Sequence, residues 1–554
     1  MKKFLCLFAI ALMIVSCGKQ NSESSYIPKD AIGVMYVNLE SLSKKSKDID
    51  FKDLSISKMA DETAPPQIKD FMDQYMTAEN MNNTFRNELV LGFMTVDRSS
   101  GSGGLIIPIK DKASFEKMIT PMLEQGPGLE KQEGVGKDKA FTVYSNREMA
   151  IGWNNETALI IAARSFAGQE LIDLTNLESS DNIYATNYYK DFLDTNKDMG
   201  MHITSTPMSS LANSLLAMFS GVEVNLEDNN LSYYLNFEED NMNAQSKLKL
   251  NKDFKSLIGY ESWMSTGYDE NLLNMLPENP AMVMKLSIDP TALYKHMESL
   301  QDNTVIPAEF REQMKEGLRQ MNRGMKREMG MTAEEVAGIF DGSMMVALTE
   351  GTVKKDSTYS YNYEKDEYEY EVFDSKIPNM YATVAIKDTE KFETLLNLAM
   401  MQGRPQEKGK NYFMISDDAF VVIKDNVIFF TNNGEKADEI YNNGKLAANL
   451  SGFKHKSNFD NSMYMYFAPG GTAIYADMVS GMNPYARMAS MGGFNIEDTY
   501  KLANDYFGES HVMMNADGME ATTYTVGEGN SLERMIMYMD AMADQASKMV
   551  QQRY

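Results

Sequence analysis

The feature that most constrains the fold of this chain is that its sequence resembles itself at long range. The segment IPKDAIGVMYVNLESL, which begins at Ile27, aligns with LPENPAMVMKLSIDPTAL, which begins at Leu276. Further matches follow in the same order along the chain: Phe85 with Phe340, the IKD…FE pattern at 109–116 with that at 386–393, and, more weakly, 199–204 with 463–468. Matches that recur in one order indicate two homologous halves. We expect these halves to be two repeats, over residues 27–265 and 266–554.

Local patterns within each half predict short strands, hairpins and amphipathic helices. Residues 34–39 alternate apolar and polar side chains with a β-branched bias, which predicts a strand. Residues 112–123 place four apolar side chains on one face of a helix, which Pro121 kinks or ends early. Hairpins are predicted at 89–109, 150–162 and 421–431. Successive hairpins with inserted helices favour an α+β fold of two homologous repeats, with mostly antiparallel sheets and packed helices.

The N-terminus has the properties of a bacterial lipoprotein signal. Residues 1–16 combine two lysines with an apolar run that is too short to span a bilayer. The IVSC sequence that ends at Cys17 resembles the bacterial lipobox, in which the cysteine thiol takes a diacylglyceryl group. We therefore expect cleavage before Cys17, lipidation of its thiol and stable anchoring by several acyl chains. Residues 17–26 are short and polar, so we expect a flexible tether.

Composition excludes several classes of function. The 554 residues carry a net charge of -26, which repels phosphate backbones, so we expect no binding of nucleic acid. The two Cys and four His leave few ligands for cysteine or histidine metal sites. Of the two cysteines, Cys6 lies in the signal peptide and Cys17 is expected to carry lipid. We therefore expect no disulfide, no cofactor and no metal site.

The repeated opening segment and the helix-opening IKD…FE pattern resemble an uncharacterised family of Bacteroides-type lipoproteins, catalogued as a domain of unknown function. The resemblance covers most of the mature chain, and its motifs are structural. It implies an extracytoplasmic lipoprotein and supplies no activity and no catalytic residues. Gly18, directly after the lipobox cysteine, favours the outer membrane by resemblance to lipoprotein sorting in other bacteria.

Methionine is unusually frequent, with 46 residues, and two clusters of it follow helical spacing. The first consists of Met314, Leu318, Met321 and Met325; the second consists of Leu532, Met535, Met539, Met542, Ala546 and Met549. Both patterns predict helix faces in which Met replaces Leu in a core. Asn530 and Glu533 are spaced as a capping box, which predicts a helix over 531–552. Because thioethers also bind Cu(I), a Met-rich metal-binding protein is an alternative.

The second half carries a tyrosine-rich insertion near 350–378 that the first half lacks. Its alternating pattern predicts a projecting hairpin with a turn at 364–367, which would pair Tyr363 with Tyr368 and Tyr361 with Tyr370. Such a ladder either packs against the body of the protein or presents an exposed recognition face. The candidate binding residues are Tyr359, Tyr361, Tyr363, Tyr368 and Tyr370.

The sequence contains no motif of a known catalytic chemistry. It has no GxSxG, HExxH or P-loop pattern, and none of its histidines lies in a recognisable motif. The GSGG sequence at 101–104 is expected to form a hairpin turn. We expect a non-catalytic binding or scaffolding lipoprotein of the outer membrane, facing the periplasm or the cell surface. Its expected partners are the membrane, through the lipid, and an envelope protein or a glycan. A carbohydrate- or peptidoglycan-active enzyme with an Asp/Glu pair is the alternative.

Overall fold

The computed structural model describes residues 23–51, 53–55, 57, 58, 75, 77–96, 101–125, 128–193, 196–209, 225–362, 367–401, 406–471 and 501–551. The chain forms two compact units: unit 1 is Met1–Phe254 with Glu528–Asp544, and unit 2 is Lys255–Gly527 with Gln545–Tyr554. The compact units thus change over at 254/255, whereas the predicted repeats change over at 265/266. Residues 528–544, which lie in the second predicted repeat, pack with unit 1. The predicted signal peptide, residues 1–16, and the predicted lipidation site, Cys17, lie outside the described residues.

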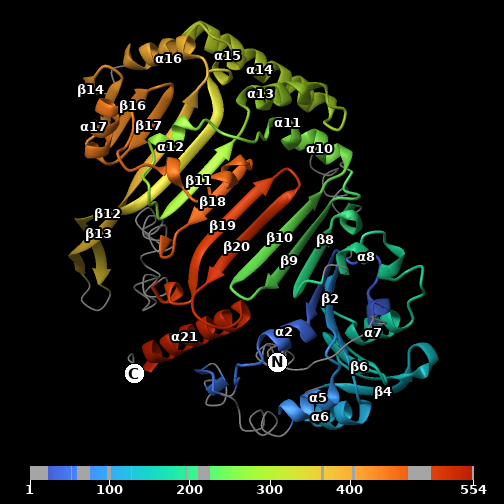
Figure 1. Cartoon of the computed structure of the whole chain (residues 1–554). Coiled ribbons are helices and arrows are strands. Elements are labelled where there is room, and N and C mark those ends of the chain that lie inside the picture. The colour runs from blue at the N-terminus through green and yellow to red at the C-terminus, as the bar shows by residue number, and fades with distance from the viewer. Residues whose placement is uncertain are drawn as a thin grey trace. The chain divides into compact units, whose positions relative to one another are not determined.

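The described strands of unit 1 pair antiparallel with one another (Figure 1). The strand order is β4-β5-β6-β7-β3-β2-β1-β8-β9-β10. Its strands are β1 Gly33–Asn38, β2 Leu89–Val96, β3 Gly101–Pro108, β4 Glu130–Val135, β5 Phe141–Ser145, β6 Met149–Trp153, β7 Thr157–Ala163, β8 Met199–Thr204, β9 Asn230–Phe237 and β10 Asn241–Lys249. Its helices are η2 Glu23–Tyr26, α2 Leu39–Lys45, α5 Ala78–Thr84, α6 Lys112–Gln125, η3 Lys137–Lys139, α7 Ala167–Thr175, η4 Ile183–Ala185, α8 Tyr189–Leu193 and η5 Thr206–Met208, with α10 Lys252–Ile258 at the unit boundary.

Helices cover both faces of the central strands of unit 1, so these strands are apolar on both sides. Leu91 of β2 lies in one core with Leu171 of α7, whereas its neighbour Val90 lies in another core with Phe115 of α6. This division follows from the strand geometry, in which successive side chains point to opposite faces. The predicted apolar face of α6 is confirmed, but the helix continues past Pro121 to Gln125.

The described strands of unit 2 pair antiparallel in the order β14-β15-β16-β17-β13-β12-β11-β18-β19-β20. Its strands are β11 Met282–Ser287, β12 Phe340–Asn362, β13 Glu367–Ile386, β14 Gln406–Gly409, β15 Tyr412–Ser416, β16 Ala419–Lys424, β17 Val427–Thr431, β18 Met463–Phe467, β19 Phe507–Asn515 and β20 Gly518–Thr525. Its helices are α11 Tyr260–Trp263, α12 Asn271–Asn274, α13 Pro290–Ser299, η6 Leu300–Asp302, α14 Ala308–Met329, α15 Ala333–Ala337, α16 Thr389–Met401, α17 Gly434–Asn443, η7 Leu450–Gly452 and η8 Lys456–Asp460. The predicted α+β class with mostly antiparallel sheets is confirmed.

The two units share one topology, because adding ten to each strand number of unit 1 gives the strand order of unit 2. Isolated bridges also correspond at positions that the sequence alignment matches. Pro28 pairs with Asn182 in unit 1, and Pro277 pairs with Asn449 in unit 2. The same holds for Phe85 with Ile109 and for Phe340 with Ile386. Each matched helix also covers an equivalent core: α6 and α16 one face, α7 and α17 the other.

Two local predictions in unit 1 are wrong. The predicted tether ends too late, since Glu23–Tyr26 form a 3-10 helix in which Glu23 is buried and paired with Arg86. The hydroxyl of the buried Tyr189 also donates to Ser24 Oγ over 2.7 Å. The glycines at 101–104 do not form the turn but begin strand β3. At Gly104, Phe93 and Ile161 press so closely on the backbone that a Cβ would collide with them.

The methionine helices form as predicted, but their apolar faces are only partly covered. Helix α14 carries the first stripe, and none of its residues is buried. Its expected role in a core is therefore wrong, because amphipathic spacing does not say what covers a face. Helix α21, Ser531–Gln551, starts at the predicted cap. The backbone N–H of Asn530 donates to Glu533 Oε2, and Asn530 Oδ1 accepts from the backbone N–H of Leu532. Its Leu532 packs against Leu42 and Phe237 of unit 1, whereas Met539 is exposed.

Among the described residues, no helix combines the length and the apolar character that crossing a membrane requires.

Candidate functional site

A cavity of about 750 Å³ opens in unit 1, beside strands β8, β9 and β10 and helix α8. This volume lies within the range of small-molecule sites. Its walls combine aromatic rings, hydroxyl and amide groups and charges of both signs. The lining residues include His202, Ser232, Tyr234, Tyr188, Asp191 and Lys247. The strand geometry explains this gathering, because His202 of β8 lies directly opposite Ser232 of β9 in the antiparallel ladder.

His202 is the chemically distinctive residue of the cavity. It is 3% exposed, and its Nδ1 atom lies 2.8 Å from Ser232 Oγ. Its ring stacks on Tyr188 with 4.1 Å between the ring centroids. Its Nε2 atom is buried and makes no hydrogen bond of acceptable geometry with a described residue, although the side chain of Asn230 lies near the ring. Burial lowers the pKa of His202 to about 4, with a smaller opposing contribution from Asn230, so the imidazole is neutral at neutral pH.

This arrangement does not match a catalytic serine–histidine pair. A Ser–His pair needs an imidazole that takes the serine proton, and a pKa of about 4 makes His202 a weak base at neutral pH. In a catalytic triad, a carboxylate orients the second imidazole nitrogen, and no described carboxylate does so here. The remaining groups of the cavity offer hydrogen bonds and aromatic surface. Lys247, for example, lies 5.7 Å above the ring of Tyr234.

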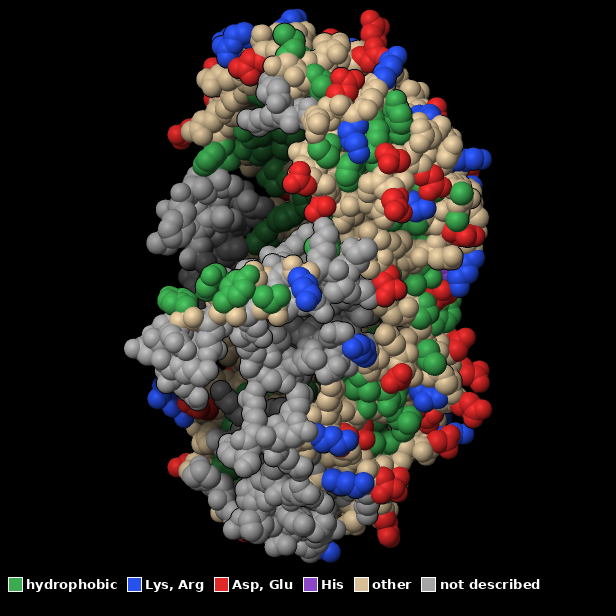
Figure 2. Space-filling view, turned by 90° about the vertical axis from the view of Figure 1, so that its left-hand side faces the viewer, with side chains coloured by type: hydrophobic (Ala, Val, Ile, Leu, Met, Phe, Trp, Pro, Cys, Tyr) green, Lys and Arg blue, Asp and Glu red, His purple; other side chains and the backbone are tan. Residues whose placement is uncertain are grey.

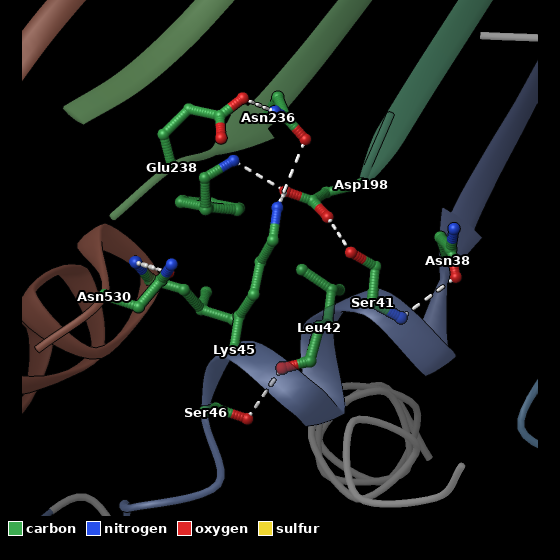
Figure 3. A network of polar contacts seen from close by, with 11 residues as sticks. Asn38, Ser41, Leu42, Lys45, Ser46, Asp198, Asn236, Glu238 and Asn530 are labelled. Atoms are coloured by element: carbon green, nitrogen blue, oxygen red, sulfur yellow. Dashed lines mark hydrogen bonds and ion pairs between the residues drawn. The ribbon is translucent and has the colours of Figure 1, made fainter. Parts of the chain in front are cut away.

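A buried polar network next to β8 holds the strands that line the cavity (Figure 3). Asp198 is fully buried directly before β8, yet it accepts hydrogen bonds from Lys45 Nζ over 2.7 Å and from the backbone N–H of Phe237 over 2.6 Å. The hydroxyl of Ser41 donates to the other carboxylate oxygen. Lys45 also donates to Asn236 of β9 over 3.3 Å. Because each carboxylate oxygen is satisfied, we interpret this network as a structural joint between α2, β8 and β9.

The topologically equivalent position in unit 2 carries a different cluster. The matched valines of β1 and β11 lie opposite His202 in unit 1 and opposite Tyr466 in unit 2. On the next strand, Ser232 corresponds to His511 by the same ladders. The position that contributes to a cavity in unit 1 is therefore occupied by an imidazole in unit 2.

His511 belongs to a group of three potential ligands that the structure brings together. One ligand atom each of His455, Glu509 and His511 lies within 4.8 Å of the others. Burial lowers the pKa of His511, and the nearby His455 lowers it further. Burial favours the neutral form of Glu509, but its hydrogen bond with Lys454 and the positive potential of Lys454 and both histidines lower its pKa overall. Sequence analysis missed this cluster: Glu509 and His511 share a strand face at i, i+2 spacing, but nothing connected them with His455.

The tyrosine insertion forms the predicted hairpin, but in another register. Tyr359 pairs with Tyr370 and Tyr361 with Tyr368, so the predicted pairing was shifted by two residues. The rings of Tyr359 and Tyr370 are in contact, with 5.0 Å between their centroids. Tyr359, Tyr368 and Tyr370 are 70%, 71% and 57% exposed, which excludes packing of these rings against the body. The side chain of Tyr361 and the whole of Tyr363 lie outside the described residues.

The sequence matches the family described as "Domain of unknown function (DUF4836)" over residues 24–477, and the chain belongs to this family. It is thus a member of an uncharacterised family. No curated protein matches the sequence. Among solved structures, crystal form III of TP0453 is similar over 45% of this chain and 90% of that chain, with 9% identity and a TM-score of 0.26. Crystal form IV is similar over 44% and 85%, with 12% identity and a TM-score of 0.25. Scores this low carry no argument about fold or function.

Proposed function

We propose that this protein is a lipid-anchored, non-catalytic binding protein of the bacterial outer membrane. Its unit 1 cavity takes a polar, hydroxyl-rich ligand of the cell envelope, such as a glycan fragment. The observation that carries this proposal is the cavity itself, of about 750 Å³, in which a buried imidazole nitrogen has no hydrogen-bond partner among the described residues. A ligand hydroxyl would satisfy that nitrogen, which acts as an acceptor when Nδ1 carries the proton.

The lining of the cavity supports a carbohydrate-like ligand. Hydroxyl and amide groups of Thr204, Asn187 and Asn230 can exchange hydrogen bonds with sugar hydroxyls, and Tyr234 offers an apolar face. The charges are close to balanced, with three lysines against two aspartates, which favours a ligand of low net charge. On the face drawn in Figure 2, acidic and basic side chains are interspersed, which agrees with a protein that does not bind nucleic acid.

The test of the cavity is calorimetric titration with oligosaccharides, starting with a chito-oligosaccharide and with fragments of purified envelope polysaccharide. Asp191→Asn and Lys247→Gln change two exposed lining residues without touching a core. We expect each to weaken binding about tenfold, the loss of one hydrogen bond to a charged group. Lys137→Gln, on the exposed 3-10 helix η3, is the matched control and should bind normally. Equal affinity in all four proteins would contradict the proposal.

The lipid anchor is supported by the short apolar signal that ends in IVSC. Metabolic labelling with palmitate in a bacterial host tests it. Cys17→Ser should lose the label and leave the outer-membrane fraction, because no acyl chain remains to hold the chain there. Cys6→Ser, within the signal peptide, is the matched control and should keep both. A labelled Cys17→Ser protein would refute lipidation at this residue.

Two homologous repeats are part of the proposal. The shared strand order and the matched bridges support an origin by duplication. If the repeats are homologous, the differences at one equivalent position, Ser232 and His511, mark specialisation of the two units.

The exposed tyrosines support contact with an envelope protein through the hairpin, since tyrosine is enriched at interaction surfaces. Crosslinking in intact cells, followed by purification, tests this contact. Deletion of 356–374 should remove one specific crosslinked partner while membrane attachment stays. A partner set that does not change on deletion would refute a role of the hairpin in recognition.

A further inference from the structure

We propose that His455, Glu509 and His511 of unit 2 form a binding site for one divalent transition metal ion. The proposal is independent of the ligand in the unit 1 cavity, because it rests on different residues in the other unit. His455 lies directly before helix η8, whereas Glu509 and His511 lie on one face of strand β19. Two chain segments that are far apart in sequence therefore direct three ligand atoms toward a common point.

The distances between these atoms fit metal coordination. Glu509 Oε1 lies 3.2 Å from His455 Nε2 and 3.5 Å from His511 Nε2. Ligand atoms at the usual bond lengths from a tetrahedral Zn²⁺ are separated by roughly 3.4 Å. Two edges of the ligand triangle therefore already have the required length. The third edge, between one nitrogen of each imidazole, is at most 4.8 Å, and rotation of the more exposed His455 ring can adjust it.

Glu509 Oε1 lies at ion-pair distance from both imidazoles, but neither contact has the geometry of a well-formed hydrogen bond. Both Nε2 atoms are buried, and neither makes a hydrogen bond of acceptable geometry with a described residue. The second carboxylate oxygen of Glu509 is occupied separately, by Lys454 Nζ at 2.7 Å and by the hydroxyl of Tyr466 at 3.4 Å. The Oε1 atom of Glu509 therefore faces the two imidazoles and is available to bind a metal ion between them. Buried polar atoms without hydrogen bonds are costly, and a cation bound beside Glu509 Oε1 would satisfy both imidazole nitrogens.

A buried tyrosine orients one of the ligands. The hydroxyl of Tyr464, on strand β18, lies 2.7 Å from His511 Nδ1 and is fully buried. With Nδ1–H donating to this oxygen, the lone pair of Nε2 is left to bind a metal. A hydrogen bond on the other ring nitrogen is the usual way in which proteins fix a ligating histidine. Tyr464 is therefore a positioning residue of the site.

Two imidazoles and one carboxylate are the ligands of zinc sites that keep a coordination position open and of non-haem Fe²⁺ sites. Such a set selects a divalent transition metal over Ca²⁺ or Mg²⁺, which prefer oxygen ligands. The side chains of His455 and Glu509 are 23% and 17% exposed, so an ion can reach the site from solvent. In unit 1, the positions equivalent to Glu509 and His511 hold Asn230 and Ser232, so we expect one ion per chain.

The experiment titrates the detergent-solubilised full chain with Zn²⁺ in competition with a chromogenic chelator. We expect one Zn²⁺ per chain. His455→Gln and Glu509→Gln should each weaken binding by more than roughly 100-fold, since loss of an outer partner alone costs about 10–100-fold. Tyr464→Phe should fall within that lower range. Co²⁺ as a second probe should show the strong visible absorption of four-coordinate cobalt, and His455→Gln should abolish it.

Matched controls separate this site from general histidine binding. His202→Gln in unit 1 and His296→Gln in helix α13 remove the two other histidines of the sequence and should leave the stoichiometry and affinity unchanged. Far-UV circular dichroism checks that each variant is folded, and the partly exposed His455 carries the least risk of unfolding. Failure of the wild-type chain to bind one Zn²⁺ would overturn the proposal. Wild-type affinity in both His455→Gln and Glu509→Gln would also overturn it and assign the ion to other groups.

Discussion

The buried His202 should make the stability of unit 1 depend on pH in a way that can be calculated. Burial lowers the pKa of this imidazole from 6.5 to about 4. The unfolded chain therefore takes up a proton between these two values and the folded chain does not. The contribution of His202 to the free energy of unfolding is at its full value above the pKa of the unfolded chain, and it is lost as the pH falls toward the folded pKa. The full loss is about 3 kcal/mol, of which about 2 kcal/mol has appeared at roughly pH 5.

Urea unfolding of two matched proteins measures this effect. Trp153 is buried in unit 1, so a Trp263→Phe background leaves its fluorescence as the only tryptophan signal. In that background, the wild-type residue is compared with His202→Gln, which keeps a hydrogen-bonding group near Ser232 but cannot titrate. The unfolding free energy of the protein with His202, minus that of His202→Gln, should fall by about 2 kcal/mol between about pH 7 and pH 5. Because both proteins share every titratable group except the imidazole of His202, the comparison cancels the remaining acid sensitivity.

Two results would refute this reasoning. A free-energy difference that is independent of pH would mean that His202 takes up its proton equally well in the folded state. If the protein with His202 instead became more stable relative to His202→Gln as the pH falls, the folded state would favour the imidazolium. His296→Gln, in unit 2, is the control and should leave the Trp153 transition unchanged at each pH.

Three substitutions test the packing and the polar contacts. Asp198→Ala removes the partner of Lys45 and should destabilise unit 1 by about 3 kcal/mol in the same urea assay, whereas a loss below about 1 kcal/mol would mean that water replaces the carboxylate. Asn530→Ala should cost about 1 kcal/mol and speed amide exchange in the first turn of α21; unchanged exchange would show that the cap is dispensable. Gly104→Ala should cost about 1–3 kcal/mol, because its Cβ collides with Phe93, and an unchanged Tm would disprove that overlap.

Sequence predicted well those elements that local patterns determine. The hairpin at 421–431 forms between β16 and β17, and its turn residues Asp425 and Asn426 both adopt positive φ, as such turns require. The alternation of strand residues and the helical spacing in α6 likewise depend on near neighbours. The long-range repeat predicted that two parts of the chain would have similar elements, and the strand orders of the two units agree with it.

The register of the tyrosine hairpin shows what a periodic pattern leaves open. A slip of one residue would turn every tyrosine to the opposite face, but a slip of two keeps all of them on the same face. Tyr370 therefore satisfies the pattern equally well opposite Tyr361 or Tyr359, and the sequence could not choose. The turn residues between β12 and β13 determine which tyrosines pair. The charged residues in this segment do not specify one turn over another two residues away.

The cavity and the histidine cluster were beyond sequence reasoning for a different reason. His455 and His511 belong to segments that meet only because β18 and β19 pair and η8 packs beside them. Nothing in either segment specifies the other. The cavity around His202 depends in the same way on β8, β9 and α8. Such sites require the three-dimensional arrangement of the strands.

The membership of residues 528–544 in unit 1 has a consequence for how the protein is made. Because a chain is synthesised from its N-terminus, residues up to Phe254 of unit 1 are made before any part of unit 2. The contact of Leu532 with Leu42 and Phe237, and the hydrogen bond from Ser531 N–H to Glu238, can form only after unit 2 has emerged. Until then, the apolar side chains of Leu42 and Phe237 lack the cover that Leu532 provides. Unit 1 therefore completes its packing only when α21, near the end of the chain, has been made, and a general chaperone that holds exposed apolar surface would act in that interval.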